Sequence, residues 1–336
     1  MKETPKERRL ATPETILALL LLLLLAGLSV ASPEFRRPSN YLGMTRFFIE
    51  VGLIALPMTL VIITGGMDLS VGSIVALAAV TLGIAWRDWH LSIWLATALG
   101  VLVGAVAGLV NGALIVGFRI PPLIVTLATM AAYRGLAIGI SRGDSIGGFP
   151  NEFRALGRGF YYLPHGIEVP GQLIYLIVFA LLFRLFLART GTGRQVYAIG
   201  LNETGAQYAG VPVGRVKLLI YSLSGAMAGL AGAVLASRMS TATSDLGLLF
   251  ELDAITACVL GGVSIYGGRG SILGSMLGLC IVGSLKRGLF FLGVEARDQS
   301  IIIGIVLILA VFVHQVVVPA VRNWRLRLSH SKEGSP

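Results

Sequence analysis

Long apolar runs follow one another along this chain from residue 15 to residue 318. The hydrocarbon core of a bilayer is about 30 Å thick, so a helix needs about 20 mostly apolar residues to cross it. Every backbone polar group in that layer must also find a partner inside the protein, which helices provide. Ten runs fit this requirement: 15–31, 46–63, 69–86, 92–117, 120–140, 171–188, 216–237, 251–265, 271–292 and 299–318. The succession predicts an all-α, polytopic integral membrane protein.

Composition excludes a soluble domain. Hydrophobic residues make up 55% of the chain and charged residues 13%, and the mean hydropathy is +0.82, far above soluble averages. Many of the 43 glycines lie inside apolar runs, as in GVLVGAVAGLVNGALIVG at 100–117. Small residues let membrane helices approach closely. We therefore expect a tightly packed helical bundle.

Charge placement predicts the orientation. An even number of spans puts both termini on one side, and the basic tails, residues 1–14 and 319–336, favour the cytoplasm. The polar segment 189–216 then lies inside the cell and the loop 141–170 outside. Four arginines oppose this bias on the outer side: Arg36, Arg37, Arg154 and Arg158. The first run could instead be a cleaved secretory signal, but SPEFRRPSN lacks a small-x-small site and many spans follow.

Several kinds of chemistry find no support in the sequence. The formal net charge of +10 is spread over tails and short loops, without a soluble basic face for nucleic acid. No Gly-Lys dipeptide occurs, so ATP would have to bind another chain. The four histidines lack metal-ligand spacing and no GxSxG elbow appears, so we expect no catalytic residue, metal site or cofactor. Cys258 and Cys280 lie in apolar stretches, which favours helix packing over a disulfide.

Interruptions of the apolar runs predict breaks or turns of the backbone. Gly65, Gly66, Asp68 and Ser70 lie between two runs with almost no room for a loop, which is typical either of a helix break lining a cavity or of a simple turn. The pair Pro121 and Pro122 can begin the fifth span. GGRGSILG at 267–274 predicts a tight turn, since no βαβ pattern surrounds it. Lys286 and Arg287 interrupt the ninth run, and we expect them to snorkel to the outer interface or to contact a pore or partner.

Four segments, in order along the chain, carry a family resemblance. They are TGGMDLSVGS (64–73), FRIPPLIVTLATMAAYRGL (118–136), TGTGRQVYAIGLNETGAQYAGVPVGRVK (190–217) and ELDAITACVLGGVSIYGGRGSILGS (251–275). Together they resemble the ribose/branched-chain-amino-acid class of ABC importer permeases, and TGGMDLSVGS resembles its sugar branch. VGLIALPMTLVI, IGGFPNEF and SDLGLLFELDAITACVLGGVSIYGG are similar to permease subunits of autoinducer-2 importers, and next to rhamnose-type permeases.

The resemblance implies a mechanism, partners and a location. Such permeases lie in the bacterial inner membrane as pairs, either homodimers or heterodimers. A periplasmic solute-binding protein delivers a sugar-like solute, and cytoplasmic ABC ATPase subunits bind ATP and drive transport. The family's ATPase-coupling loop corresponds to 200–216, and implies contacts from Gly200, Asn202, Glu203, Ala206 and Gly210. The family's usual Glu-Ala-Ala opening reads Glu203, Thr204, Gly205, Ala206 here. An ordinary amphipathic loop is the alternative.

Polar residues inside the apolar runs are candidates for the solute path, because such residues are costly in a membrane. They are Thr64, Asp68, Ser70, Asn111, Thr126, Thr129, Asp253 and Thr256. For each, a helix cap or an interhelical hydrogen bond is the structural alternative. An ion-coupled secondary transporter with Asp68 as its ion site is the second functional hypothesis. A membrane enzyme would need paired carboxylates, a metal cluster or a nucleophile with its base, and none is evident.

Overall fold

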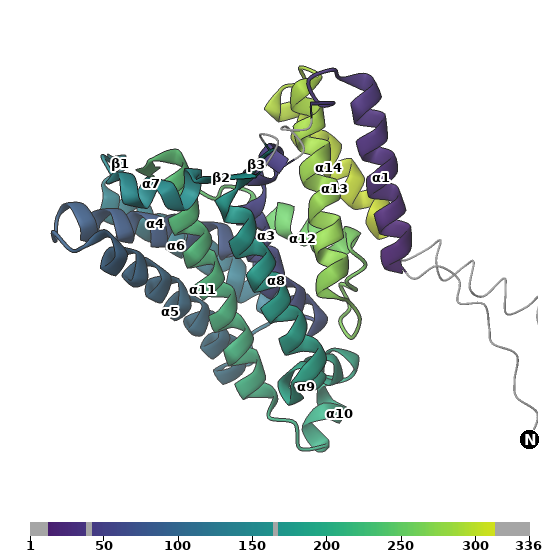
Figure 1. Ribbon diagram of the computed structural model, residues 1–336. Helices are drawn as coiled ribbons and strands as arrows, with labels where there is room; N and C mark the ends of the chain where they lie inside the picture. Colours follow the sequence, from purple (N-terminus) through teal and green to yellow (C-terminus); the bar gives the residue numbers. More distant parts are fainter. Residues whose placement is uncertain (1–12, 38–41, 164–166, 313–336) are drawn as a thin grey trace, which may run out of the picture.

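The computed structural model describes residues 13–37, 42–163 and 167–312. The helices of this part are α1 (Pro13–Ala31), η1 (Met44–Phe47), α3 (Ile49–Ile63), α4 (Val71–Arg87), α5 (Ile93–Gly117), α6 (Pro122–Ser141), α7 (Asn151–Arg158), α8 (Gly171–Arg189), α9 (Gly191–Leu201), α10 (Glu203–Tyr208), α11 (Val213–Met239), α12 (Phe250–Leu260), α13 (Ile272–Phe291) and α14 (Ala296–Phe312). Four short strands complete it: β1 (Ile146–Gly147), β2 (Phe160–Leu163), β3 (Ile167–Pro170) and β4 (Thr241–Ala242). Figure 1 shows long helices side by side, with α7, β2 and β3 at one end and α9 and α10 at the other.

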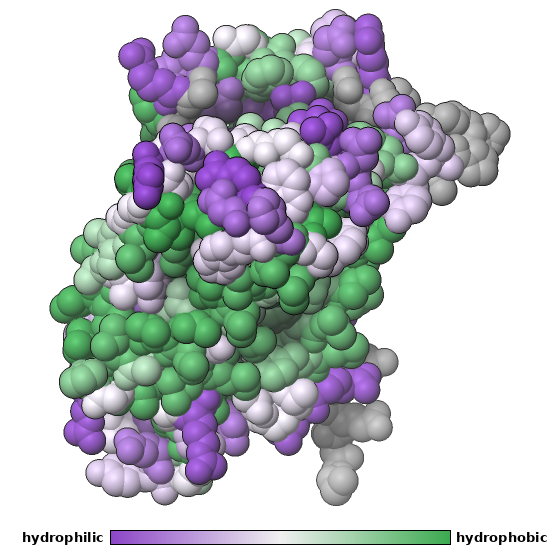
Figure 2. All heavy atoms as spheres, turned by 90° about the vertical axis from the view of Figure 1, so that its left-hand side faces the viewer, coloured by the Kyte–Doolittle hydropathy of each residue, from purple (hydrophilic) through white to green (hydrophobic). Residues whose placement is uncertain are grey.

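A helix occupies each of the ten ranges that the apolar runs predict, as far as these ranges are described, so the mainly helical fold is confirmed; residues 313–318 of the last range lie outside the described residues. Within the described residues, six helices are long and apolar enough to cross a membrane: α1, α5, α6, α8, α11 and α13. Two more apolar helices, α3 and α4, are shorter, with 15 and 17 residues. A broad hydrophobic band separates two hydrophilic ends of the surface (Figure 2). Exposed leucines such as Leu102 and Leu109 on α5 and Leu127 on α6 face outward.

The centre of the bundle is α3, whose residues are all buried. A helix that is apolar on every side belongs in the interior, which is why the run 49–63 shows no polar face. Pro57 lies in its middle without ending it. The helix ends at Ile63, where Gly65, in the left-handed conformation at φ +78°, reverses the chain toward α4.

Contact between α5 and α11 rests on glycines. A β-carbon on Gly104 or Gly108 of α5 would overlap with the backbone of Gly225 or Tyr221 on α11. Gly100 meets Gly229 while Gly112 meets Leu218, so the two helices are antiparallel. Close backbone approach of this kind supplies dispersion contacts that lipid cannot replace. The glycine-rich stretch 100–117 therefore packs as its sequence predicts.

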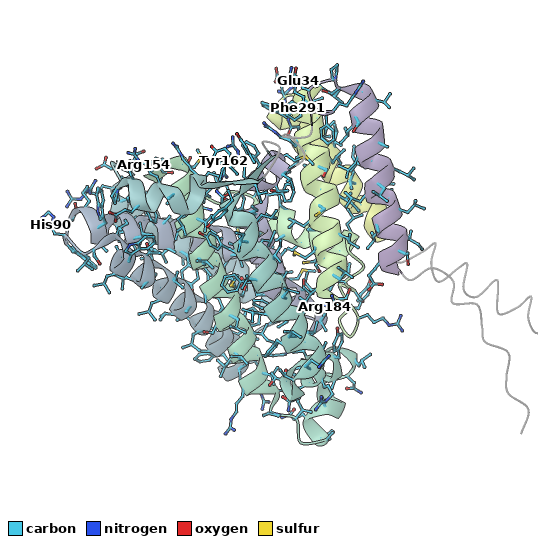
Figure 3. The ribbon with its side chains drawn as sticks, viewed as in Figure 1. Glu34, His90, Arg154, Tyr162, Arg184 and Phe291 are labelled. Carbon is cyan, nitrogen blue, oxygen red and sulfur yellow. The ribbon has the colours of Figure 1, made fainter. Side chains whose placement is uncertain are left out.

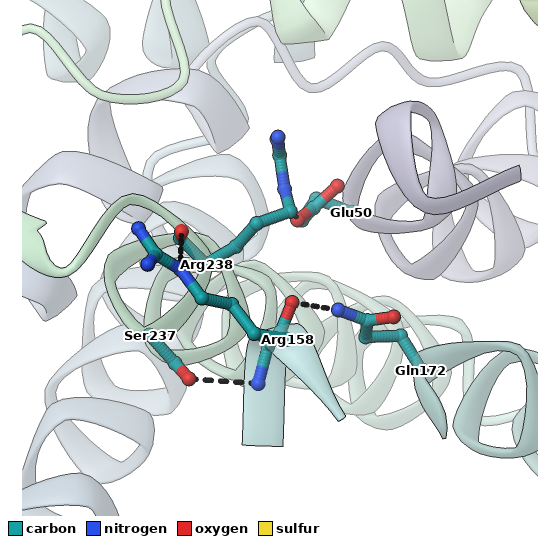
Figure 4. A network of polar contacts seen from close by, with 6 residues as sticks. Glu50, Arg158, Gln172, Ser237 and Arg238 are labelled. Atoms are coloured by element: carbon teal, nitrogen blue, oxygen red, sulfur yellow. Dashed lines mark hydrogen bonds and ion pairs between the residues drawn. The ribbon is translucent and has the colours of Figure 1, made fainter. Parts of the chain in front are cut away.

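The α7 end is more ordered than a loop prediction for 141–170 implies. β1 pairs with β4, and β2 with β3, both antiparallel. Hydrogen bonds hold α7 to its neighbours (Figure 4): the Gly157 amide donates to Ser237 Oγ at 2.7 Å, and Gln172 Nε2 donates to the Gly157 carbonyl oxygen. Phe149 and Phe153 are fully buried, with ring centroids 5.0 Å apart. Hydrogen bonds thus anchor this segment on α11 and α8, and the buried ring of Phe149 packs on Trp86 of α4 at 5.2 Å between ring centroids.

The structure corrects one sequence prediction and adds an ion-pair partner to another. The eighth predicted span, 251–265, is not one crossing helix: α12 has 11 residues and the chain then turns, and at about 1.5 Å per residue such a helix is too short to span the core. Lys286, whose side chain is 37% exposed, has a partner that the sequence prediction did not name: its Nζ lies 2.5 Å from Asp253 Oδ2. The tight turn predicted at 267–274 is present, with positive φ at Gly267 and Gly268, and both described cysteines are free.

Candidate functional site

A polar network lies where α3 breaks before α4. We define the Asp68 network as Asp68, Ser70, Asn111, Tyr133 and Ser224, all buried. Asp68 Oδ1 accepts from the Ser70 amide at 3.1 Å and from Ser70 Oγ at 2.6 Å, and Asp68 Oδ2 accepts from Ser224 Oγ at 2.8 Å. Asn111 Nδ2 donates to Ser70 Oγ at 2.7 Å. The network therefore joins the helix break to α5, α6 and α11.

Tyr133 on α6 closes the network. Its hydroxyl lies 2.9 Å from the Ala107 carbonyl oxygen and 3.2 Å from Asn111 Oδ1. Thr126, also on α6, donates to the carbonyl oxygen of Met67 at 3.2 Å. Non-helical backbone at membrane depth is tolerated when its polar groups are satisfied by protein. The broken segment 64–70 meets that condition through side chains of three neighbouring helices.

Four of the predicted path residues come together here: Asp68, Ser70, Asn111 and Thr126. The other four do not join them. The hydroxyls of Thr64, Thr129 and Thr256 bond to carbonyls of their own helices, those of Val61, Val125 and Leu252, and Asp253 pairs with Lys286 on α13. Sequence reasoning missed Ser224 and Tyr133. A hydroxyl in the small-residue run SLSGAMAGLAGA is the signal that points to Ser224.

The second candidate site is the helical unit α9–α10, at the end opposite α7 (Figure 1). Thr190 caps α9 by accepting from the Gly193 amide at 3.0 Å, and Asn202 caps α10 by accepting from the Gly205 amide at 2.9 Å. Threonine and asparagine caps satisfy otherwise free amides at a helix start. Gly210, at φ +82°, then turns the chain toward α11. The caps and the turn give α9–α10 a fixed shape that projects from the bundle, and we call this unit the knob.

Backbone contacts anchor this unit under α3. A β-carbon on Gly200 would overlap with the Ile63 carbonyl oxygen, to which the Gly268 amide donates at 2.8 Å. Tyr197 on α9 donates its hydroxyl proton to the Gly270 carbonyl oxygen at 2.8 Å. Burial raises the pKa of the Tyr197 phenol, which keeps it a donor at neutral pH. The knob thus rests on the end of α3, next to the Asp68 network.

The residues predicted to contact the ATPase mostly hold the α9–α10 unit in place, and other side chains form its exposed surface. Gly200 and Ala206 face the protein, and Ala206 is 6% exposed. Asn202 is a cap, Glu203 Oε1 lies 2.6 Å from Lys217 Nζ, and Gly210 turns the chain. Two apolar side chains project from the unit instead: Leu201, 70% exposed, and Tyr208, 89% exposed. These two side chains are therefore the parts of the unit most accessible to a partner.

The bundle, the satisfied break and the projecting knob define a multi-pass membrane transport protein. The chain belongs to the family described as "Branched-chain amino acid transport system / permease component", which matches residues 40–311. Proteins of this family are integral permease subunits of ATP-binding cassette importers, and this chain is accordingly a multi-pass protein of the bacterial inner membrane.

Curated relatives cover nearly the whole chain. It is 43% identical to the ribose import permease protein RbsC of Bacillus subtilis over 296 residues, 87% of this chain and 89% of the relative. It is 38% identical to the autoinducer 2 import system permease protein LsrD of Salmonella paratyphi A over 304 residues, 89% of this chain and 90% of the relative. For the LsrD protein of Photorhabdus temperata the identity is 37% over 327 residues, with 95% and 96% covered. No solved structure matches the chain.

Proposed function

We propose that this chain forms, with a second permease, the membrane path of an importer for a small sugar or sugar-like solute. The observation that carries the proposal is the similarity, over most of the chain, to permeases named for ribose and for autoinducer 2 import. Ribose-type and autoinducer-2-type relatives are both similar, so the cargo is proposed as a class that includes rhamnose, ribose and autoinducer 2. Delivery by a periplasmic solute-binding protein is part of the proposal.

Ten crossings with both termini in the cytoplasm form the proposed topology, with the eighth made by α12 together with the turns that follow it. Helix directions support it. The α1 and α13 helices are parallel, because Ser271 Oγ reaches Glu14 near both starts and Leu28 packs on Gly288 near both ends. This suits the first and ninth crossings of an alternating series. The antiparallel contact of α5 and α11 suits the fourth and seventh.

The α9–α10 unit is the proposed docking point for a cytoplasmic ATPase that binds ATP. Tyr208 and Leu201 offer the apolar contact, and Gly200, Ala206 and Asn202 hold the knob in shape. A displacement of the unit would be transmitted through the Gly200 contact to Ile63. Asp68, the centre of the Asp68 network, follows Ile63 by five residues in the chain. Path residues of the alternating-access cycle are accordingly proposed around Asp68, Ser70, Asn111 and Thr126.

Uptake of radiolabelled ribose, rhamnose and autoinducer 2 in cells lacking this chain tests the proposal. We expect loss of uptake of one solute, restored by the intact gene but not by Gly210→Asp. Gly143→Asp is the matched control, since Gly143 has φ +77° and open space around it as Gly210 does, but lies at the α7 end. Uptake that continues without ATP would instead favour an ion-coupled secondary transporter.

A further inference from the structure

Three arginines surround one phenylalanine at the α7 end. The guanidinium carbons of Arg46, Arg238 and Arg287 lie 4.7, 5.7 and 4.2 Å from the ring centroid of Phe47. They come from η1, α11 and α13, so distant parts of the sequence bring them together. Arg287 also lies 4.4 Å from the ring centroid of Phe290 and 4.7 Å from that of Phe291. Figure 3 shows Phe291 near this end of the molecule, close to Glu34.

Only one of the three guanidinium groups has a carboxylate partner among the described residues. Arg238 Nε lies 2.7 Å from Glu50 Oε1, and Glu50 is buried. Within the same described ranges, Arg46 and Arg287 form neither a hydrogen bond through their side chains nor an ion pair, and Arg287 Nε is buried without a partner. The cluster therefore keeps two uncompensated positive charges.

The two positive charges held against one ring repel each other, so this arrangement requires a compensating interaction. Stacking on aromatic faces offsets part of the cost, but it leaves the planar N–H groups of both guanidiniums unused. Arginine forks match carboxylate and phosphate oxygens, and charge-assisted bonds of this kind are strong. The placement also opposes the expected bias of basic residues toward the other end. An anion is the missing element.

The surroundings of the cluster point to the membrane boundary. Phe47 is 38% exposed and Phe290 55% exposed, and Leu292 beside them is 45% exposed. Apolar rings suit the hydrocarbon, and arginines beside them can extend their charged ends to the adjacent lipid headgroups. A soluble acidic partner would leave these rings in water. A phospholipid provides both a phosphate for the arginines and an acyl chain for the rings.

We propose that Arg46 and Arg287, which both lie against the ring of Phe47, bind a phosphate group, supplied by a phospholipid headgroup at the α7 end of the bundle. The two guanidiniums donate to the phosphate oxygens, and Phe47 and Phe290 contact the lipid below the headgroup. Glu50 neutralises Arg238, so that the bound anion meets two free positive charges rather than a carboxylate. The proposal is independent of which solute the importer carries.

Native mass spectrometry of the purified full-length chain in detergent measures the binding. Phosphatidylglycerol is the probe, diacylglycerol is the matched lipid without phosphate, and inorganic phosphate tests the free anion through the melting temperature. We expect the Arg46→Gln/Arg287→Gln double variant to bind phosphatidylglycerol about a hundredfold more weakly than the parent chain, since each of the two lost charged hydrogen bonds contributes about tenfold. Diacylglycerol should bind both proteins equally.

The control double variant is Arg37→Gln/Arg297→Gln. It removes two exposed arginines that already pair with Glu34 and Asp298, so it changes the net charge equally and should bind lipid like the parent chain. Stabilisation by inorganic phosphate without retained lipid would assign the same site to a free phosphate. Equal binding of phosphatidylglycerol and of phosphate by parent and Arg46→Gln/Arg287→Gln would overturn the proposal, and so would an equal loss in the control. Should the double variant not fold, Arg46→Gln alone, at a partly exposed position of η1, should weaken phosphatidylglycerol binding about tenfold.

Discussion

Gly200 of α9 lies against the carbonyl oxygen of Ile63, the last residue of α3, with no space between them for a side chain. The contact joins the proposed ATPase-docking unit to the helix that leads into the Asp68 network. Because backbone meets backbone, neither side can yield by changing a rotamer. This junction is a backbone-to-backbone contact between the α9–α10 unit and the end of α3.

Replacing Gly200 should therefore break the link while leaving the knob intact. In Gly200→Ala the new β-carbon would overlap with the Ile63 oxygen and approach the Gly268 amide, and overpacking of this kind costs about 1–3 kcal/mol. We expect severely reduced uptake with ATPase subunits still bound, measured by transport and by co-purification. Gly191→Ala in the same helix, whose nearest neighbour would be Arg194 at 3.9 Å, should behave like the parent chain. Equal uptake in both variants would contradict the link.

The packing of α5 on α11 should likewise not tolerate an added side chain at its glycines. Gly108→Ala would overlap with the Tyr221 carbonyl oxygen, so we expect a loss of about 1–3 kcal/mol in stability, seen as a lower melting temperature in detergent. Gly139→Ala on α6 is the control, because nothing lies within 4 Å of its added carbon. The same melting temperature for the two variants would show that the helices separate more easily than their contacts imply.

Substitutions of Asp68 distinguish whether transport requires the hydrogen bonds of this side chain or its negative charge. Asp68→Ala leaves the hydroxyls of Ser70 and Ser224 without their acceptor, at about 1–3 kcal/mol for each buried group left unpaired, and we expect it to abolish uptake with the protein still in the membrane. Asp68→Asn keeps one acceptor oxygen, so it should retain part of the uptake and most of the stability. Unchanged transport by Asp68→Ala would remove this residue from the path.

The Lys286 and Asp253 pair should couple α13 to α12. The two side chains are 37% and 14% exposed and lie 2.5 Å apart, so a double-mutant cycle of Lys286→Met and Asp253→Asn should give a coupling energy of about 1–2 kcal/mol in thermal unfolding. The cycle for Arg297 and Asp298, which are 3.6 Å apart with Arg297 84% exposed, should give close to zero, as exposed pairs do. Coupling energies of similar size in the two cycles would mean that the partial burial of the Lys286–Asp253 pair does not strengthen it.

Sequence by itself determined the class of fold, because the length and polarity of an apolar run are local properties, and they decide whether that run can cross a bilayer as a helix. The ten helical ranges, the glycine-rich packing of 100–117 and the break at 64–70 all follow from such local patterns. Family membership followed from four ordered motifs, which also located the α9–α10 unit.

Tertiary structure alone decided which polar groups meet. Ser224 joins Asp68 from a helix 156 positions away, and Asp253 leaves the predicted path set because Lys286 approaches it from α13. The short α12 was misjudged because its apolar run continues past Leu260 into turns. Nothing local in the sequence records the rotation of one helix against another, and that rotation determines whether a membrane-embedded polar side chain caps a helix, pairs with a charge or faces a path.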